Sequence, residues 1–135
     1  MAAWILPTFG YILTLGVAGV TAKLALRTIS WQQMVLWVPI AYAVFAVSFA
    51  VFRGARLPLG VGGGWAAATA LCASSALILF FVALTHGEAS KVVPASSAYP
   101  VVTLAASALF LSESITLVRV VGTALVIVGL VLISR

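Results

Sequence analysis

Long apolar segments alternate with short polar connections along the 135 residues of this chain. A helix needs about 20 apolar residues to cross the hydrocarbon core of a bilayer, and each segment comes close to that length. The pattern therefore predicts an all-α integral membrane protein, with a single domain of five transmembrane helices over residues 1–135. The predicted spans lie at about residues 4–22, 31–52, 65–84, 91–111 and 117–134.

An odd number of spans places the two ends of such a unit on opposite sides of the membrane. Two copies can then face each other in opposite orientations, as the repeats of many secondary transporters do. We therefore expect the chain to form one repeat of an inverted-repeat transporter fold.

The composition agrees with a membrane protein. Hydrophobic residues make up 64% of the chain and charged residues 7%, which is too little polar surface for a water-soluble domain. The seven basic residues lie singly or in pairs near segment ends, where cations meet lipid headgroups. The net charge of +5 therefore does not indicate nucleic-acid binding. No Lys or Arg precedes Lys23, so the first segment lacks the basic region of a cleavable signal peptide.

Cations are distributed almost evenly across the membrane. The side of the amino terminus receives three, namely Arg53, Arg56 and Arg119. The opposite side receives four, namely Lys23, Arg27, Lys91 and Arg135. The positive-inside rule depends on larger differences, so one interpretation is dual topology, in which copies insert both ways. The alternative is that Lys23 or the first helix selects one orientation, and a partner supplies the other.

The segment over residues 91–111 is the most informative for function. Ser96, Pro100, Thr103 and Ser107 are separated by steps of four, three and four, which places them on one face of a helix. Hydroxyl groups gain nothing against lipid, whereas along a water-filled cavity they can bind a substrate. Pro94 and Pro100 remove backbone donors, and bent helices can act as hinges in transporters. The alternative is that these hydroxyls only support packing between helices.

Two further residues complete the predicted substrate site. Tyr99 belongs to the same segment, and Lys23 is the most embedded cation of the chain. We expect Lys23 to lie at the mouth of the cavity, unless its side chain extends to the headgroups instead. In the last segment, Gly122 and Gly129 are seven residues apart and predict a close helix contact, within one subunit or between two.

The sequence offers no pattern for catalysis or for a cofactor. His86 is the single histidine and lies at a helix end, without the Cys or Glu cluster that a metal site needs. Both acidic residues, Glu88 and Glu113, fall in connections, where Glu88 can pair with Lys91. We therefore expect no enzyme activity, no metal and no cofactor.

Four stretches form a recognisable pattern, namely ALTHGEASKVVP at residues 83–94, YPVVT at 99–103, ALFLSE at 108–113 and GTALVIVG at 122–129. Together they resemble the EamA-like part of the drug/metabolite transporter superfamily. In that family a turn of Gly-Ala-Ser type leads into a helix with proline, followed by a Leu-Phe-Leu-Gly-Glu close and a final helix with spaced glycines. Lys23 also resembles a lysine that is common in this family at the end of the first helix. Ser112 departs from the pattern, because the family usually has glycine there.

The resemblance implies a function and an assembly. Most members carry two five-helix repeats with a cavity between them, and this chain resembles one repeat. It is thus expected to export or exchange small organic metabolites or drugs in a prokaryotic inner membrane. The expected assembly is a homodimer, antiparallel or not, or a pair of different half-transporters. The alternative is a membrane subunit that does not transport and instead scaffolds or regulates a partner. The first segment has no acidic residue, so the proton-coupled mechanism of the related small multidrug resistance proteins does not transfer.

Overall fold

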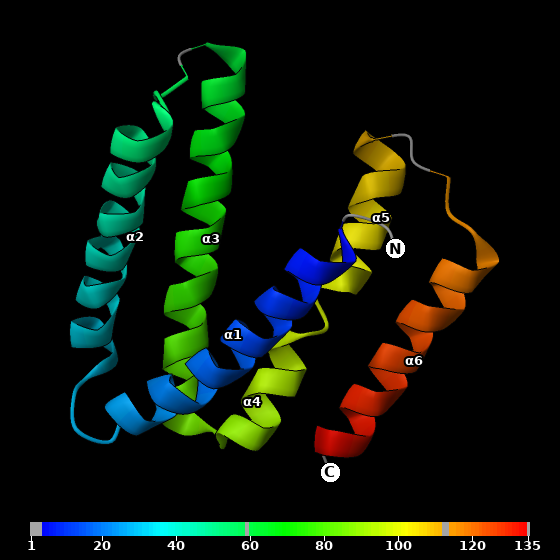
Figure 1. The fold of residues 1–135 in the computed structure, drawn as a ribbon. Helices are drawn as coiled ribbons and strands as arrows, with labels where there is room; N and C mark the ends of the chain where they lie inside the picture. The colour runs from blue at the N-terminus through cyan, green and yellow to red at the C-terminus, as the bar shows by residue number, and fades with distance from the viewer. Residues whose placement is uncertain (1–3, 59, 112–113, 135) are drawn as a thin grey trace. The chain divides into compact units, whose positions relative to one another are not determined.

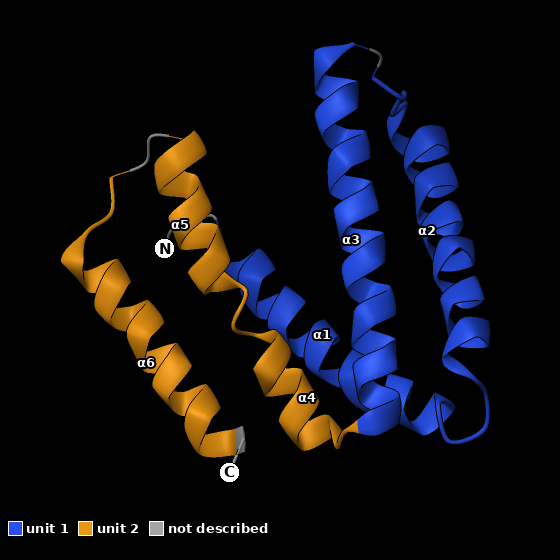
Figure 2. Ribbon diagram, turned by 180° about the vertical axis from the view of Figure 1, so that it is seen from behind, with its two compact units in different colours: residues 1–86 blue, residues 87–135 orange. Residues whose placement is uncertain are grey.

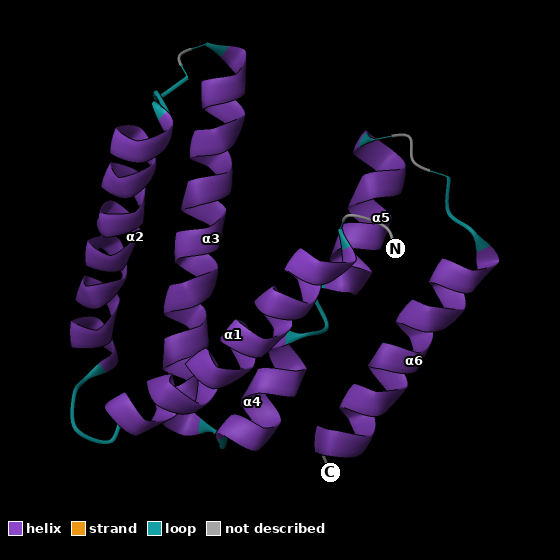
Figure 3. Cartoon of the chain, in the orientation of Figure 1, coloured by secondary structure: helices purple, strands orange, loops and turns teal. Residues whose placement is uncertain are grey.

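The computed structural model of the chain describes residues 4–58, 60–111 and 114–134. Within these residues the chain is helical and contains no strand (Figure 1, Figure 3). The helices are α1 (Ile5–Ala25), α2 (Trp31–Arg53), α3 (Val61–His86), α4 (Ala89–Ser96), α5 (Pro100–Phe110) and α6 (Leu117–Ser134).

Length and apolar composition make most of these helices candidate membrane spans. The first three helices qualify singly, and α4 and α5 together form a fourth candidate over Ala89–Phe110. The last helix is apolar but shorter, over Leu117–Ile133. These findings confirm the prediction of an all-α membrane protein.

The chain divides into two compact units, Met1–His86 and Gly87–Arg135 (Figure 2). The first unit contains α1 to α3, and the second contains α4 to α6. That all 135 residues act as one membrane domain stays a prediction.

The boundaries of α2 follow from local sequence signals. The Ser30 Oγ accepts a hydrogen bond from the Gln33 N–H at 3.3 Å, and the Gln33 Oε1 accepts one from the Ser30 N–H at 2.9 Å. This reciprocal capping box satisfies two donors that the first turn of a helix leaves free. At the other end, Gly54 has a φ of 64°, a left-handed conformation that suits glycine and ends the helix.

The first unit has its buried residues where α1 meets the end of α3 (Figure 1). On α1 the buried residues are Gly19 and Ala22, and on α3 they are Phe81 and Leu84. Small residues on α1 let the two helices approach closely.

The fourth span is broken between Ser96 and Pro100. Here the Ser97 N–H donates to the Pro94 carbonyl at 3.0 Å and the Ala98 N–H to the Ala95 carbonyl at 3.2 Å, both three residues back. These are tighter turns than those of an α-helix, and such stretches often mark hinges. Pro100 then begins α5, where its missing N–H costs nothing.

The break changes one detail of the predicted segment over residues 91–111. We expected Ser96 to share a continuous helix face with Pro100, but the two residues belong to different helices, because the proline starts a new one. Two residues of the family-like stretch, Ser112 and Glu113, lie outside the described residues, as does Arg135.

Candidate functional site

A groove of about 520 Å³ lies between α5 and α6 in the second unit. It is largely open to its surroundings. Three of the residues predicted to bind substrate line it together, namely Tyr99, Thr103 and Ser107. The remaining lining residues are Pro100, Leu104, Leu111, Arg119, Gly122, Thr123 and Val126.

The helical repeat explains why these three polar residues meet. Tyr99, Thr103 and Ser107 follow one another at intervals of four, so their side chains lie on one face of α5. Pro100 fixes where the helix begins.

Two of the groove hydroxyls donate to their own helix. The Thr103 Oγ1 donates to the Tyr99 carbonyl at 3.3 Å, and the Ser107 Oγ donates to the Leu104 carbonyl at 3.1 Å. A hydroxyl oxygen that has donated its proton still has lone pairs that can accept. This side of the groove therefore suits a solute with N–H or O–H donors.

The opposite wall contains residues that the sequence analysis assigned to other roles or missed. Arg119 was assigned to the lipid headgroups, Gly122 to helix packing, and Thr123 was not considered. Arg119 and Thr123 are four residues apart on α6, and this spacing is the signal that could have suggested a second polar wall. The Arg119 Nη1 donates to the Ser114 carbonyl at 3.1 Å, which uses one of the five guanidinium donors.

Ser96 and Lys23 do not line this groove. The Ser96 Oγ donates to the Val93 carbonyl at 2.7 Å within α4. The Lys23 Nζ lies in the first unit and donates to the Leu84 carbonyl at 2.6 Å, near the end of α3. Carbonyls in the last turn of a helix lack partners within the helix, so Lys23 satisfies one of them. A contact between either residue and a substrate stays a prediction.

We expect Lys23→Met to destabilise the first unit. Methionine fills a similar volume but cannot donate to the Leu84 carbonyl, and losing a charged hydrogen bond costs about 1.5–3 kcal/mol. Thermal unfolding of the purified protein in detergent measures the effect. The matched control is Lys91→Met, because the Lys91 side chain is 55% exposed and, among the described residues, pairs only with Glu88. Equal midpoints for the two variants would contradict a structural role of Lys23.

The residues predicted for hinges and packing occupy distinct positions. Pro94 lies inside α4 and Pro100 begins α5, on the two sides of the break. Apart from its chain neighbours and its own helix backbone, a Cβ added at Gly122 or Gly129 would meet no atom within 4 Å in the described part of the chain. That these glycines form a close contact with another helix, such as one from a second copy, therefore remains a prediction.

The acidic residue that the structure describes forms a surface ion pair. The Glu88 Oε2 lies 3.6 Å from the Lys91 Nζ, in the pairing expected from the sequence. Exposed pairs of this kind contribute only about 0–1 kcal/mol. Among the residues with described positions, no group of three or more His, Cys, Asp or Glu side chains could hold a metal ion.

We expect Glu88→Gln to leave transport almost unchanged. Glu88 is exposed in the connection before α4, so it is not placed to carry a proton across the bilayer. Uptake in reconstituted vesicles with and without a pH gradient tests this. A loss of gradient-dependent uptake at normal expression would show that Glu88 is part of the coupling mechanism.

Comparison with known proteins agrees with the arrangement of helices. The profile of the EamA-like transporter family matches residues 2–135. An uncharacterized protein of Methanocaldococcus jannaschii is 47% identical over 57 residues, which cover 42% of this chain and 42% of that protein. No solved structure matches the chain. With a family match over almost its whole length and several apolar helices long enough to span a bilayer, the chain belongs to the EamA-like transporter family and is a multi-pass membrane protein.

Proposed function

We propose that this chain is a half-transporter that works as a homodimer of oppositely oriented copies in a prokaryotic inner membrane. The dimer exports or exchanges a small polar or amphipathic organic solute by alternating access. The groove lined by Tyr99, Thr103 and Ser107 is the observation on which this proposal depends. A volume of about 520 Å³ falls within the range of small-molecule sites, roughly 300–1,000 Å³.

The chemistry of the groove fits a solute with hydrogen-bond donors. The oxygens of Thr103 and Ser107 have lone pairs that can accept, while Leu104 and Val126 supply apolar contact. Because the groove is open, a second surface must close it before a solute is shielded from water. In our proposal the second copy supplies that surface. Contacts of Ser96 and Lys23 with the solute remain part of the proposal.

The broken span provides the movement. Alternating access needs one part of each copy to rock against another around a fixed site. The turn over residues 97–99 joins α4 to α5 directly beside the groove, so a change of angle there would open or close it. Pro94 and Pro100 are the hinges in this proposal.

A thermal-shift screen of the purified protein against a metabolite library tests the proposed function. A solute that binds only the folded state at 100 times its Kd stabilises that state by about 2.7 kcal/mol. We expect a small set of related solutes with N–H or O–H donors to raise the melting temperature. If no solute does, and a partner membrane protein copurifies, the chain is a scaffolding or regulatory subunit instead.

We expect Thr103→Val to weaken binding of such a solute about three- to tenfold. Valine keeps nearly the same volume but removes the oxygen that would accept from the solute, and a hydrogen bond contributes about 0.6–1.5 kcal/mol. Equilibrium binding to the purified protein measures the change.

The matched control is Thr69→Val on α3. The Thr69 Oγ1 donates to the Trp65 carbonyl at 2.9 Å, as Thr103 does to its own helix, but Thr69 does not line the groove. Binding should therefore stay unchanged in Thr69→Val. Equal affinities in both variants would remove Thr103 from the site.

A further inference from the structure

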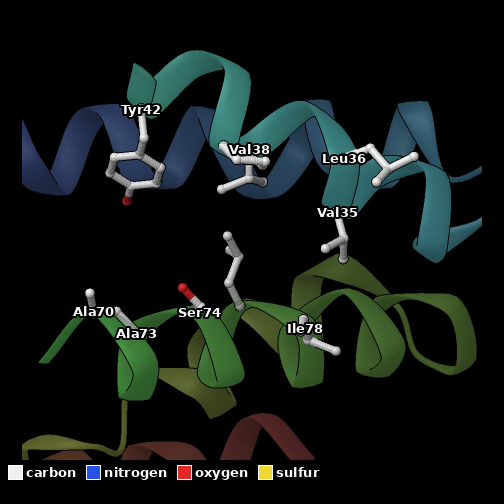
Figure 4. A pocket seen from close by; sticks show the side chains of 10 residues that line it. Val35, Leu36, Val38, Tyr42, Ala70, Ala73, Ser74 and Ile78 are labelled. Atoms are coloured by element: carbon white, nitrogen blue, oxygen red, sulfur yellow. The ribbon is translucent and has the colours of Figure 1, made fainter. Parts of the chain in front are cut away.

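The first unit contains a partly open cavity of its own, between α2 and α3, with a volume of about 560 Å³ (Figure 4). Its walls are almost entirely apolar, and no charged residue lines it. The lining residues are Val35, Leu36, Val38, Pro39, Tyr42, Ala70, Ala73, Ser74, Leu77 and Ile78.

Two hydroxyl groups point into this cavity from opposite walls. Tyr42 comes from α2 and Ser74 from α3, and Figure 4 shows each hydroxyl directed toward the facing helix. Both residues lie near the middle of their helices, so both hydroxyls belong to the central part of the predicted spans.

Neither hydroxyl forms a hydrogen bond with any residue that the structure describes. Neighbouring hydroxyls in the same helices behave differently. The Ser75 Oγ donates to the Leu71 carbonyl at 2.9 Å, and the Ser48 Oγ donates to the Val44 carbonyl at 2.8 Å. A Ser hydroxyl in a membrane helix commonly forms this bond to its own backbone, so Ser74 is unusual in turning away from it.

The position in the membrane restricts what can fill the cavity. A hydroxyl without a partner in hydrocarbon costs free energy, and lipid tails offer neither a donor nor an acceptor. A charged ligand would find no countercharge among the lining residues. The occupant that satisfies both constraints is neutral, mostly apolar, and carries a hydrogen-bonding group.

We propose that this cavity is a binding site for a neutral apolar small molecule that bears a hydroxyl group, held between Tyr42 and Ser74. The ligand enters from the bilayer, where such molecules concentrate. This site lies in the other unit from the α5–α6 groove and does not depend on the function proposed for that groove.

A pair of photoreactive probes of nearly equal size tests the proposal. 4-(Hydroxymethyl)benzophenone carries the hydroxyl, and 4-ethylbenzophenone replaces it with a methyl group. Each is photolysed with the full chain reconstituted in lipid vesicles, and mass spectrometry measures the label on peptides from α2 and α3. We expect the hydroxyl probe to label these peptides about tenfold more, the ratio that about 1.4 kcal/mol of hydrogen bonding produces.

Variants assign the preference to the two hydroxyls. Tyr42→Phe and Ser74→Ala together should reduce the tenfold preference to nearly one, while the ethyl probe continues to label the same peptides and shows that the cavity persists. Ser75→Ala is the matched control and should keep the preference, because the Ser75 hydroxyl bonds its own helix. Ala73→Phe should reduce labelling by both probes, since the ring fills the cavity.

Two results would overturn the proposal. Equal labelling by both probes in the unaltered chain would mean that the cavity accepts lipid tails and other apolar molecules without selection. A preference that survives in the double variant would mean that the hydroxyl probe binds elsewhere.

Discussion

Adding two lysines to the connection between α2 and α3, and removing two cations from the opposite side, should place most copies of this chain in a single orientation. The change is Ala55→Lys with Leu57→Lys, at two exposed positions beside Arg56, together with Arg27→Gln and Lys91→Gln. It raises the cations on the side of Arg56 from three to five and lowers those on the other side from four to two, a difference of three instead of one. Orientation follows such differences, so copies that insert both ways should become largely uniform, with the altered connection in the cytoplasm.

Reporters fused to the carboxyl terminus measure this result. One reporter should be active only in the cytoplasm and the other only outside it. In the unaltered chain we expect both to be active, and in the altered chain we expect one signal to fall to a small fraction of its former value.

The opposite change provides the control. Arg53→Gln with Arg56→Gln leaves one cation on that side against four, so the other orientation should dominate. Each variant alone should lose transport if the working dimer needs both orientations, and coexpression of the two should restore it. A wild-type chain that inserts in one orientation and transports alone would rule out dual topology.

Much of the fold could be predicted because its signals are local. The Ser30 and Gln33 capping box and Gly54 determine where α2 begins and ends, and both lie within a few residues of the helix. The polar face of α5 was also predictable, since intervals of four residues place Tyr99, Thr103 and Ser107 together in any helix.

The remainder depends on contacts between segments distant in sequence. The Lys23 Nζ donates to the backbone carbonyl of Leu84. Every residue has such a carbonyl, so the residue type at position 84 does not indicate this contact. Arg119 and Thr123 become part of a groove only when α6 is placed beside α5. Tyr42 and Ser74 lie on different helices, so the sequence does not indicate that their hydroxyls face the same cavity.

The break in the fourth span involves a proline, which is compatible with two different local structures. Pro100 indicated a bend, because the carbonyl of Ser96 would otherwise accept from the N–H at position 100. Proline is equally suited to the first position of a new helix, and the structure has this second arrangement. Residue type alone does not choose between them, since the choice depends on how α4 and α5 pack.

Pro100→Ala should slow transport by about tenfold while changing solute affinity less than twofold. Alanine restores the N–H that can donate to the Ser96 carbonyl and favours a continuous helix from α4 into α5. The turn needs little change to become helical, because Ser97 and Tyr99 already have φ values of −75° and −54°. One or two added hydrogen bonds of about 1 kcal/mol each would stabilise the straight form and raise the barrier to bending by a similar amount.

Turnover in vesicles and equilibrium binding, measured on the same preparations, separate the two effects. Pro100→Gly restores the same N–H but disfavours a helix by about 1 kcal/mol relative to alanine, so its turnover should fall between that of Pro100→Ala and that of the unaltered chain. Pro7→Ala is the control, because Pro7 lies in the first turn of α1, where a missing N–H breaks no helical hydrogen bond. If Pro100→Ala transports as fast as the unaltered chain, the break between α4 and α5 is a fixed feature of the fold, and the movement of the transport cycle occurs elsewhere.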